Sequence, residues 1–350
     1  MKIAQIAPLV ESVPPRLYGG TERVVSYLTE ALVERGHQVT LFASGDSTTS
    51  ANLTSFRDQA LRLDPVAQKS ALAAHLSMLQ SIHDRADDFD VLHFHIDLLP
   101  FPIFKAVAHK TVTTLHGRQD RQDLAPVYRR WRHYPLVSIS ESQRKPMPWA
   151  NWAKTIHHGL PANLCLPPSQ PRGDYLAFLG RISPEKRPDR AIEIARRIAM
   201  PLKIAAKVDV ADARYFHAVI EPLLKDADVE FIGEIDDSRK SDFLGNAAAL
   251  LFPIDWPEPF GLVMIEAMAC GTPVVAWREG SVPEVVDDGI SGRVVSDIEE
   301  AVAAVAEVRA FDRRGIRACF ERRFDAAHMV DKYETLYLQL TEEQQFLKEA

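Results

Sequence analysis

This 350-residue sequence has few cysteines, no long apolar runs and no large excess of either charge. The three cysteines are widely spaced and odd in number, which argues against a disulfide framework or a zinc site and predicts a reducing, cytoplasmic location. No apolar run approaches the ~18 residues of a membrane span, and the N-terminal apolar stretch is too brief for a secretory signal. With 41 basic and 48 acidic residues, the formal charge of −7 gives no reason to expect a nucleic-acid partner.

The Gly-x-Gly-x-x-Gly fingerprint of dinucleotide-binding proteins is also missing, which argues against an NAD-dependent enzyme. What the chain does have is length. Its 350 residues exceed one ordinary core and suit two domains of roughly 100 to 200 residues each. Two cores imply a cleft between them.

Short apolar runs rich in β-branched residues alternate with longer helical patterns, as in parallel sheets that are covered on both faces. A helical stripe over 22–35 ends at Gly36, and a stretch over 160–173 rich in proline and glycine predicts the linker between domains. The final segment, 316–350, is helical and charged and could pack on either domain. The predicted strands lie at 3–7, 39–43, 91–94, 112–115 and 136–139 in the first half, and at 175–179, 202–206, 229–232, 249–252, 273–276 and 293–295 in the second.

Paired glycines, Gly19 and Gly20, lie between the first predicted strand and the first predicted helix. Glycines at such a junction let backbone N–H groups approach an anion, although they serve equally well in a tight turn. The pair alone therefore leaves both interpretations open.

The second half opens with Arg181, followed by Ser183-Pro184, which is typical of a helix N-terminus. Lys186 then falls in the first helical turn, where a cation opposes the helix dipole. A bound diphosphate would make this placement favourable, with Arg181 as a bidentate fork and Lys186 as a point charge. The alternative is two solvated surface cations.

A loop stiffened by prolines carries Glu258 into a predicted helix that starts at about Gly261 and is apolar almost all round except for Glu266. The two carboxylates are expected on the order of 10 Å apart with the helix N-terminus between them. That spacing suits a nucleoside diphosphate sugar, with pyrophosphate on the amides near Phe260, Gly261 and Leu262, ribose on Glu266 and hexose on Glu258. The alternative is a structural Glu266 and an ordinary loop Glu258.

Taken together, these residues resemble the retaining GT-B glycosyltransferases, the family of group 1 glycosyl transferases, over nearly the whole chain. The resemblance is carried by the glutamate pair and by several shorter matches. These matches are Gly19-Gly20, Thr114-Leu115-His116-Gly117, Val137-Ser138-Ile139-Ser140-Glu141-Ser142, Arg181 with Lys186, and Gly271-Thr272-Pro273-Val274-Val275.

The resemblance implies two Rossmann-like domains facing each other across a cleft. These would be an acceptor-binding domain over 1–165 and a donor-binding domain over 172–327, with the helix from about 328 able to pack back on the first. It also implies an enzyme that transfers a hexose, with retention of configuration, from a nucleoside diphosphate sugar to a sugar, small-molecule or lipid-linked acceptor. Family frequency makes UDP-glucose the default donor, and no metal or cofactor is expected.

By the same resemblance, Arg181 and Lys186 would neutralise the donor diphosphate and His116 would lie beside the anomeric centre, so that these residues and Glu258 form the catalytic set. Catalysis would rest on positioning and on stabilising the departing phosphate, which helps to deprotonate the acceptor. His93 and His95, with Asp97 nearby, raise the alternative of a metal site, but family members use such residues to line the acceptor cleft.

One departure and one ambiguity concern the acceptor side. Where many members have Pro-Asn-Gly before the linker, this chain has His157-His158-Gly159, so a role of that asparagine does not carry over. Cations and tryptophans gather in the first domain, either as solvated faces or as a dock for a lipid-linked acceptor at a membrane surface. They are Arg118, Arg121, Arg129, Arg130, Arg132, Arg144, Lys145, Trp131, Trp149 and Trp152.

Two other functions suit the same architecture and remain open. One is a non-hydrolysing sugar-nucleotide epimerase. The other is an accessory protein that binds the sugar nucleotide but has lost turnover. The intact donor motif together with His116 favours an active transferase over the accessory protein.

Overall fold

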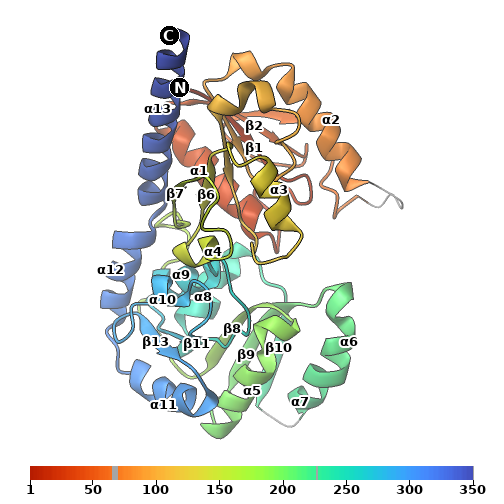
Figure 1. The fold of residues 1–350 in the computed structure, drawn as a ribbon. Coiled ribbons are helices and arrows are strands. Elements are labelled where there is room, and N and C mark those ends of the chain that lie inside the picture. The colour runs from red at the N-terminus through yellow and green to blue at the C-terminus, as the bar shows by residue number, and fades with distance from the viewer. Residues whose placement is uncertain (65–69, 226–227, 350) are drawn as a thin grey trace. The chain divides into compact units, whose positions relative to one another are not determined.

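The computed structural model describes residues 1–64, 70–225 and 228–349, with residues 343–349 described by their backbone alone. It divides into two compact units, Met1–Gly159 with Ala326–Ala350 as unit 1 and Leu160–Asp325 as unit 2 (Figure 1). Each unit is built around its own parallel sheet with helices packed against it. The predicted α/β class with two Rossmann-like domains is therefore confirmed.

Unit 1 contains a seven-stranded sheet in the order β3-β2-β1-β4-β5-β6-β7, with every neighbouring pair parallel. The central strands are buried along their whole length, as their apolar runs predict. The strand order reverses between β1 and β4, and ligands bind at the carboxyl ends of strands beside such a reversal. The strands are β1 (Lys2–Ile6), β2 (Gln38–Ala43), β3 (Asn52–Ser55), β4 (Val91–Phe94), β5 (Thr111–Thr114), β6 (Leu136–Ser138) and β7 (Trp152–Thr155).

The helices of unit 1 include one from the far end of the chain. Helix α1 runs to Glu34 and ends before Gly36, whose φ of 84° suits the left-handed turn that stops a helix. The helices are α1 (Gly20–Glu34), α2 (Ala71–His83), α3 (Leu124–Arg130), α4 (Glu141–Arg144) and α13 (Ala326–Glu349), with short 3-10 turns at η1 (Ala86–Asp88) and η2 (Lys105–Lys110).

Helix α13 is part of the core of unit 1, where it packs against α1 (Figure 1) and against β4. Tyr333 and Tyr337 on this helix are almost completely buried. At its outer edge, Arg35 forms ion pairs with Asp331 and Glu334. The sequence left open which domain this helix joins, and the structure assigns it to the first.

Unit 2 repeats the architecture with a six-stranded sheet in the order β10-β9-β8-β11-β12-β13, again parallel throughout. Its strand order reverses between β8 and β11. The strands are β8 (Leu176–Arg181), β9 (Leu202–Lys207), β10 (Val229–Gly233), β11 (Ala249–Phe252), β12 (Val274–Trp277) and β13 (Gly292–Val295).

The helices of unit 2 cover this sheet: α5 packs on β8 and β9, α9 on β11 and β12, and α11 on β12 and β13. The helices are α5 (Pro188–Arg197), α6 (Ala213–Tyr215), α7 (Glu221–Lys225), α8 (Asp237–Gly245), α9 (Leu262–Ala269), α10 (Val282–Val285), α11 (Ile298–Val308) and α12 (Arg313–Phe324). Short turns lie at η3 (Pro184–Lys186), η4 (Val210–Asp212) and the π-helical η5 (Phe216–Ile220).

The prediction that a helix starts at Ser183-Pro184 is wrong, because the helix starts four residues later. The chain forms only the short turn η3 there, after which Arg187 adopts a left-handed conformation with φ 52° and α5 begins at Pro188. A proline disfavours the right-handed helical conformation in the residue before it, so Pro188 prevents the turn from continuing into the helix. Lys186 consequently lies in a turn before the helix.

The two ends of unit 2 lie next to each other. The Leu160 amide donates to the Phe324 carbonyl at 2.9 Å, and Leu160 forms a parallel bridge with Asp325. Unit 2 is therefore one continuous segment whose first and last residues meet. In the part of the chain that the structure describes, no helix combines the length and apolar character needed to cross a membrane.

Candidate active site

The first feature of the site in unit 2 is the start of α9, which follows the loop after β11. Gly261 precedes the helix with a φ of 80°, a conformation that favours glycine. A Cβ at this position would lie 2.8 Å from Cε of Met264 and 3.1 Å from Cζ of Phe252. Only glycine therefore fits at the tight turn that leads into α9. The amide end of this helix lies beside Phe260 and Leu262.

Glu258, in the same loop, is 8% exposed and is held by two side chains. Its Oε2 forms an ion pair with Lys186 and accepts a hydrogen bond from the Trp256 indole N–H at 2.8 Å. Lys186 Nζ also lies 4.9 Å from the Trp256 ring centroid, within the range of a cation–π contact. The two residues that the sequence singled out separately, Lys186 and Glu258, are in direct contact.

Glu266 is 3% exposed on α9, and its Oε1 lies 2.6 Å from Nζ of Lys240. Lys240 comes from α8 and also lies 3.0 Å from Asp237. The costly burial of the Glu266 carboxylate is therefore balanced by a buried cation. No local sequence pattern indicates that Lys240 is this partner.

Arg181, at the end of β8, is surrounded by acidic groups. Its guanidinium lies 2.6 Å from Glu185, 3.7 Å from Asp209 and 3.7 Å from Asp212. Burial raises the pKa of Asp212 above its ordinary value. Arg181 and Lys186 are thus each bound to a carboxylate, and neither is the solvated surface cation of the alternative interpretation.

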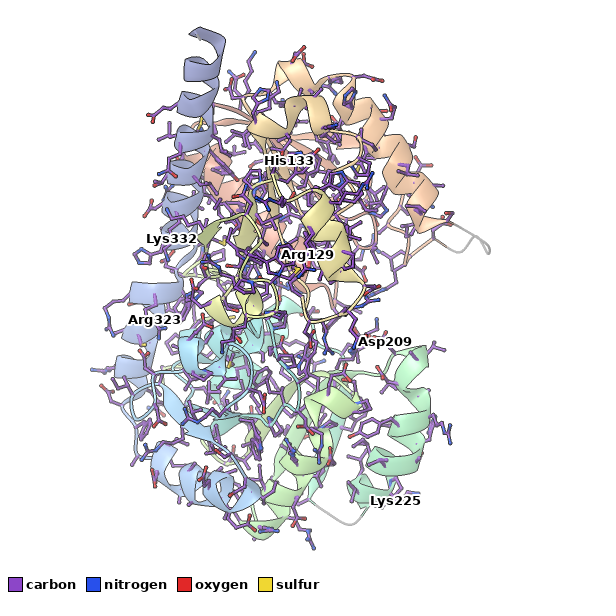
Figure 2. All side chains as sticks on the ribbon, in the orientation of Figure 1. Arg129, His133, Asp209, Lys225, Arg323 and Lys332 are labelled. Atoms are coloured by element: carbon purple, nitrogen blue, oxygen red, sulfur yellow. The ribbon has the colours of Figure 1, made fainter. Side chains whose placement is uncertain are left out.

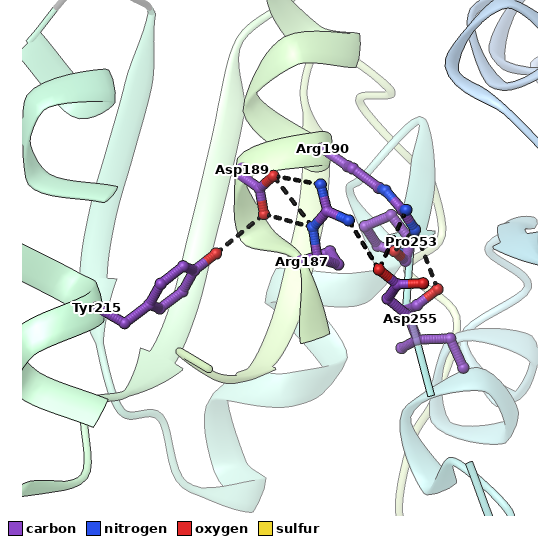
Figure 3. Close-up of polar contacts among 7 residues, drawn as sticks. Arg187, Asp189, Arg190, Tyr215, Pro253 and Asp255 are labelled. Atoms are coloured by element: carbon purple, nitrogen blue, oxygen red, sulfur yellow. Dashed lines mark hydrogen bonds and ion pairs between the residues drawn. The ribbon is translucent and has the colours of Figure 1, made fainter. Parts of the chain in front are cut away.

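A second arginine, Arg187, braces the loop that carries Glu258 (Figure 3). Arg187 donates to Asp189 at 2.8 to 3.1 Å and to Asp255 at 2.9 Å. Arg190 adds bonds to the carbonyls after β11, and the Tyr215 hydroxyl donates to Asp189 at 2.9 Å. The start of α5 and the loop before α9 are thereby held together.

Gly280 supports Glu258 from the other side, through its lack of a side chain. Its φ is 55°, and a Cβ here would lie 2.3 Å from both the backbone N and O of Glu258. The next residue, Ser281, donates its amide to the Glu258 carbonyl at 3.0 Å and its hydroxyl to the Phe260 carbonyl at 2.8 Å. Sequence reasoning missed this support, because no local pattern shows that a backbone segment some 20 residues earlier packs on the glycine.

In unit 1, the paired glycines lie where the sequence placed them, between β1 and α1. Gly19 is extended, and a Cβ on it would lie 2.7 Å from Cβ of Pro15. Gly20 is the first residue of α1. Glu22 in the first turn is 6% exposed, and burial raises the pKa of its carboxyl to about 7.

Four histidines gather at the carboxyl ends of the strands of unit 1. His95 Nδ1 lies 2.9 Å from His116 Nε2, and the His158 ring stacks on His116 with centroids 5.2 Å apart. Burial lowers the pKa of all four, that of His116 to about 3, so the cluster is neutral at physiological pH. His93 completes the group, with its ring centroid 4.1 Å from that of His95.

The predicted acceptor residues His93 and His95 bind protein groups in this structure. His93 contacts the Tyr337 hydroxyl and the Thr114 hydroxyl, each at 2.7 Å, and His95 contacts Gln5 and His116. Both ring nitrogens of each histidine are thus bonded within unit 1, and His95 bonds directly to His116. Among residues 1–64, 70–225 and 228–349, no group of three or more His, Cys, Asp or Glu side chains is arranged to hold a metal ion.

The cations and tryptophans of unit 1 are partly paired with one another. Arg129 lies on α3 (Figure 2), and its guanidinium is 4.8 Å from the Trp149 ring centroid. Arg144 stands 5.7 Å from the Trp152 ring. These cation–π contacts order the side chains without identifying a ligand.

Both units therefore place polar side chains at the carboxyl ends of parallel strands, the position at which open α/β sheets bind their ligands. Two family models match the chain: Glycosyltransferase Family 4 over residues 18–159 and Glycosyl transferases group 1 over residues 168–311. The chain belongs to the group 1 glycosyl transferases, and it is a glycosyltransferase.

Curated relatives carry the same activity class. The chain is 26% identical over 374 residues to phosphatidyl-myo-inositol mannosyltransferase of Mycobacterium leprae, covering 96% of this chain and 97% of that protein. It is 28% identical over 258 residues to D-inositol 3-phosphate glycosyltransferase of Mycolicibacterium smegmatis, covering 66% of this chain and 55% of that protein.

Solved structures show the same fold. Sucrose-phosphate synthase from Thermosynechococcus elongatus matches with a TM-score of 0.80 at 20% identity, over 98% of this chain and 99% of that one. AviGT4, a glycosyltransferase involved in avilamycin A biosynthesis, matches with a TM-score of 0.72 at 23% identity, over 97% and 98% of the two chains. The fold is GT-B.

Proposed function

We propose that this protein transfers a hexose, with retention of configuration, from a nucleoside diphosphate sugar to a hydroxyl of a sugar, small-molecule or lipid-linked acceptor. The observation that carries the proposal is the ion pair between Lys186 and Glu258 beside the amide end of α9. It joins a cation suited to phosphate and a carboxylate suited to sugar hydroxyls within one small volume.

The chemistry of this pair explains how it serves a donor. An ammonium group has three N–H donors, so Lys186 can keep its contact with Glu258 while it binds a phosphate oxygen. An ionised carboxylate only accepts hydrogen bonds, and Glu258, oriented by the Trp256 indole, is suited to hexose hydroxyls. The positive end of α9 adds to the attraction for a pyrophosphate.

The remaining roles follow the same logic. Arg181 stabilises the departing phosphate, and Glu266 accepts from the ribose hydroxyls beside Lys240. In unit 1, His116 contacts the reacting sugar, and the Gly19-Gly20 loop supplies backbone amides. The phosphate leaves with the bonding electrons of the anomeric carbon–oxygen bond and takes the proton of the acceptor hydroxyl that attacks from the same face.

Binding of the donor is tested by thermal shift with UDP-, GDP- and ADP-sugars. A ligand at about 100 times its dissociation constant adds about 2.7 kcal/mol of stability, and we expect UDP-glucose to give the largest rise in Tm. A larger rise with a GDP- or ADP-sugar would correct the base while supporting the class. No response to any of the three would contradict the donor site.

The transferase assignment is tested with Lys186→Ala and Glu258→Ala. We expect both variants to fold and to lose transfer, whereas Lys225→Ala, an exposed lysine of the same unit, retains it. Incubation with donor alone distinguishes an epimerase, which would produce an epimer. Donor that is bound but never consumed across an acceptor panel would indicate an accessory protein.

The acceptor is a hydroxyl compound of a class that the relatives exemplify. By their names, the relatives from Mycobacterium leprae and Mycolicibacterium smegmatis act on phosphatidyl-myo-inositol and inositol 3-phosphate. Co-sedimentation with anionic vesicles at low and high salt tests for a lipid-linked acceptor at a membrane surface. An absence of binding at both salt concentrations would remove that option and leave soluble acceptors.

A further inference from the structure

A chain of buried hydrogen bonds links helix α13 to His116 within unit 1. The Tyr337 hydroxyl accepts from Gln5 Nε2 at 3.1 Å, and Gln5 Oε1 lies 2.8 Å from His95 Nε2. His95 Nδ1 lies 2.9 Å from His116 Nε2. Gln5, His95 and Tyr337 are at most 3% exposed, so water does not compete for these bonds.

The chain fixes the position of each hydrogen. The Gln5 amide nitrogen donates to Tyr337, so its carbonyl oxygen faces His95 and accepts the proton on His95 Nε2. A neutral imidazole has one N–H, which leaves His95 Nδ1 as an acceptor. His116 must then donate from Nε2, and its Nδ1 keeps a lone pair.

His116 Nδ1 is enclosed and, in the described part of the chain, has no hydrogen-bond partner. The ring as a whole is only partly buried, and it is held from two sides by His95 and His158. A buried acceptor without a donor costs about 1–3 kcal/mol, a cost that a donating hydroxyl removes.

We propose that Tyr337, Gln5 and His95 are positioning residues that hold His116 in its Nε2–H tautomer, so that Nδ1 accepts a hydrogen bond from a substrate hydroxyl. The use of this acceptor rests on the proposed function, in which both the transferred hexose and the acceptor carry hydroxyls. The tautomer itself depends only on the structure of unit 1. A helix from the last 25 residues thereby acts on a side chain after β5.

The tautomer is tested directly by ¹⁵N NMR of the histidine side chains, with His116 assigned from its disappearance in His116→Asn. We expect a protonated Nε2 and an unprotonated Nδ1 in the full-length protein without ligand. The opposite tautomer, or an imidazolium, would overturn the proposal. Because this readout needs no turnover, it is independent of whether the protein proves to be a transferase.

A matched pair of variants tests the positioning role. Tyr337→Phe removes the hydroxyl that orients Gln5 and contacts His93, whereas Tyr333→Phe removes a buried hydroxyl one turn away that bonds to Thr114. We expect Tyr337→Phe to give mixed His116 tautomers and to lower kcat/KM about tenfold, the equivalent of one neutral hydrogen bond. Tyr333→Phe should lower Tm similarly but retain the single tautomer and kcat/KM within about twofold.

The same kinetics identify the source of the hydroxyl. A rise in the donor KM in Tyr337→Phe assigns it to the transferred hexose, and a rise in the acceptor KM assigns it to the acceptor. Gln5→Met, which keeps the size of the side chain without its amide, should reproduce the Tyr337→Phe result if that variant folds poorly. Equal kinetic effects of the two tyrosine substitutions would contradict the proposal.

Discussion

Glu22 lies in the first turn of α1, where the helix dipole favours a charged carboxylate, yet burial dominates its protonation. Glu11 nearby raises its pKa further, while Arg62 lowers it, and the net value is about 7. Between pH 4.5 and about 7, the folded chain therefore keeps a proton that the unfolded chain has lost. Stability falls as the pH rises through this window, by up to about 3 kcal/mol.

We predict that Glu22→Gln removes this loss. The Tm of the wild-type protein should fall relative to that of Glu22→Gln between pH 5 and pH 8, with the two differing most at pH 8. Differential scanning calorimetry at pH 5 and pH 8 measures this difference in Tm. Glu34→Gln, an exposed position on the same helix, is the control, and a Glu22→Gln profile parallel to the wild type would refute the argument.

Substitutions at two glycines of unit 2 distinguish the effect of backbone strain from the effect of a clash at the site. Gly280 and Gly289 both have positive φ, at 55° and 82°, but a Cβ meets the backbone of Glu258 only at Gly280. At Gly289, the nearest atom to a Cβ is 3.9 Å away, on the side chain of Arg293.

Both Gly280→Ala and Gly289→Ala should lose about 1–3 kcal/mol of stability from the left-handed backbone. Only Gly280→Ala should also weaken donor binding, because its methyl group displaces Glu258. Calorimetric titration with the nucleotide sugar measures the difference. Equal affinity in the two variants would show that Gly280 does not support the loop.

At the scale of residues, the sequence was better at identifying single site residues than at identifying which residues interact with them. Glu258 and Glu266 could be singled out because a carboxylate in an apolar helix and one between prolines are locally unusual. Their partners were harder to foresee: Lys240, on another helix, looks like any helical lysine. Sequence spacing also could not show that Lys186 and Glu258, 72 residues apart, form an ion pair.

Among the elements, the buried central strands were predicted and two edge strands were missed. Strands β3 and β7 are four residues long and largely exposed or half-exposed, so they lack the apolar run by which the others were found. The break between η3 and α5 was missed for another reason: the strong start signal at Ser183-Pro184 masked the second one at Pro188.

The brace around Arg187 gives a prediction for the element that holds Glu258. Asp255→Ala removes the carboxylate that joins Arg187 to the loop after β11 (Figure 3). The pair is partly exposed, so we expect only a small loss of stability. Because the loop is loosened, donor affinity should weaken about two- to fivefold. Isothermal titration of the donor into the variant tests this expectation.

Glu299→Ala is the matched control for that variant. Glu299 lies on α11 of the same unit and forms an exposed ion pair with Arg197, which the substitution removes. It should leave donor affinity unchanged. If both substitutions weaken binding alike, the effect is one of general charge rather than of the brace.

For the whole molecule, length and the restart of the strand pattern were enough to predict two similar domains. The return of the C-terminal helix to unit 1 was implied by the family resemblance alone, because its sequence pattern suits either core until the buried contacts of Tyr333 and Tyr337 are known. The His116 environment depends on this return, so sequence alone could identify the histidine but not its hydrogen bonds.

The division into units predicts how fragments behave. We expect residues 160–325 to fold alone and to bind the same nucleotide as the full chain, since the segment has its own sheet and donor residues. Residues 1–159 without α13 should be poorly folded, because the helix that covers β4 is absent. Thermal melts of both fragments with and without nucleotide test this, and a donor fragment that fails to respond would contradict it.

The meeting of Leu160 with Phe324 and Asp325 has a practical consequence for engineering. A segment whose two ends are neighbours can be exchanged as a cassette, in the way that inserted domains tolerate transplantation. Grafting the corresponding segment of a relative between Gly159 and Ala326 should therefore produce chimeras with a new choice of sugar nucleotide and the original choice of acceptor.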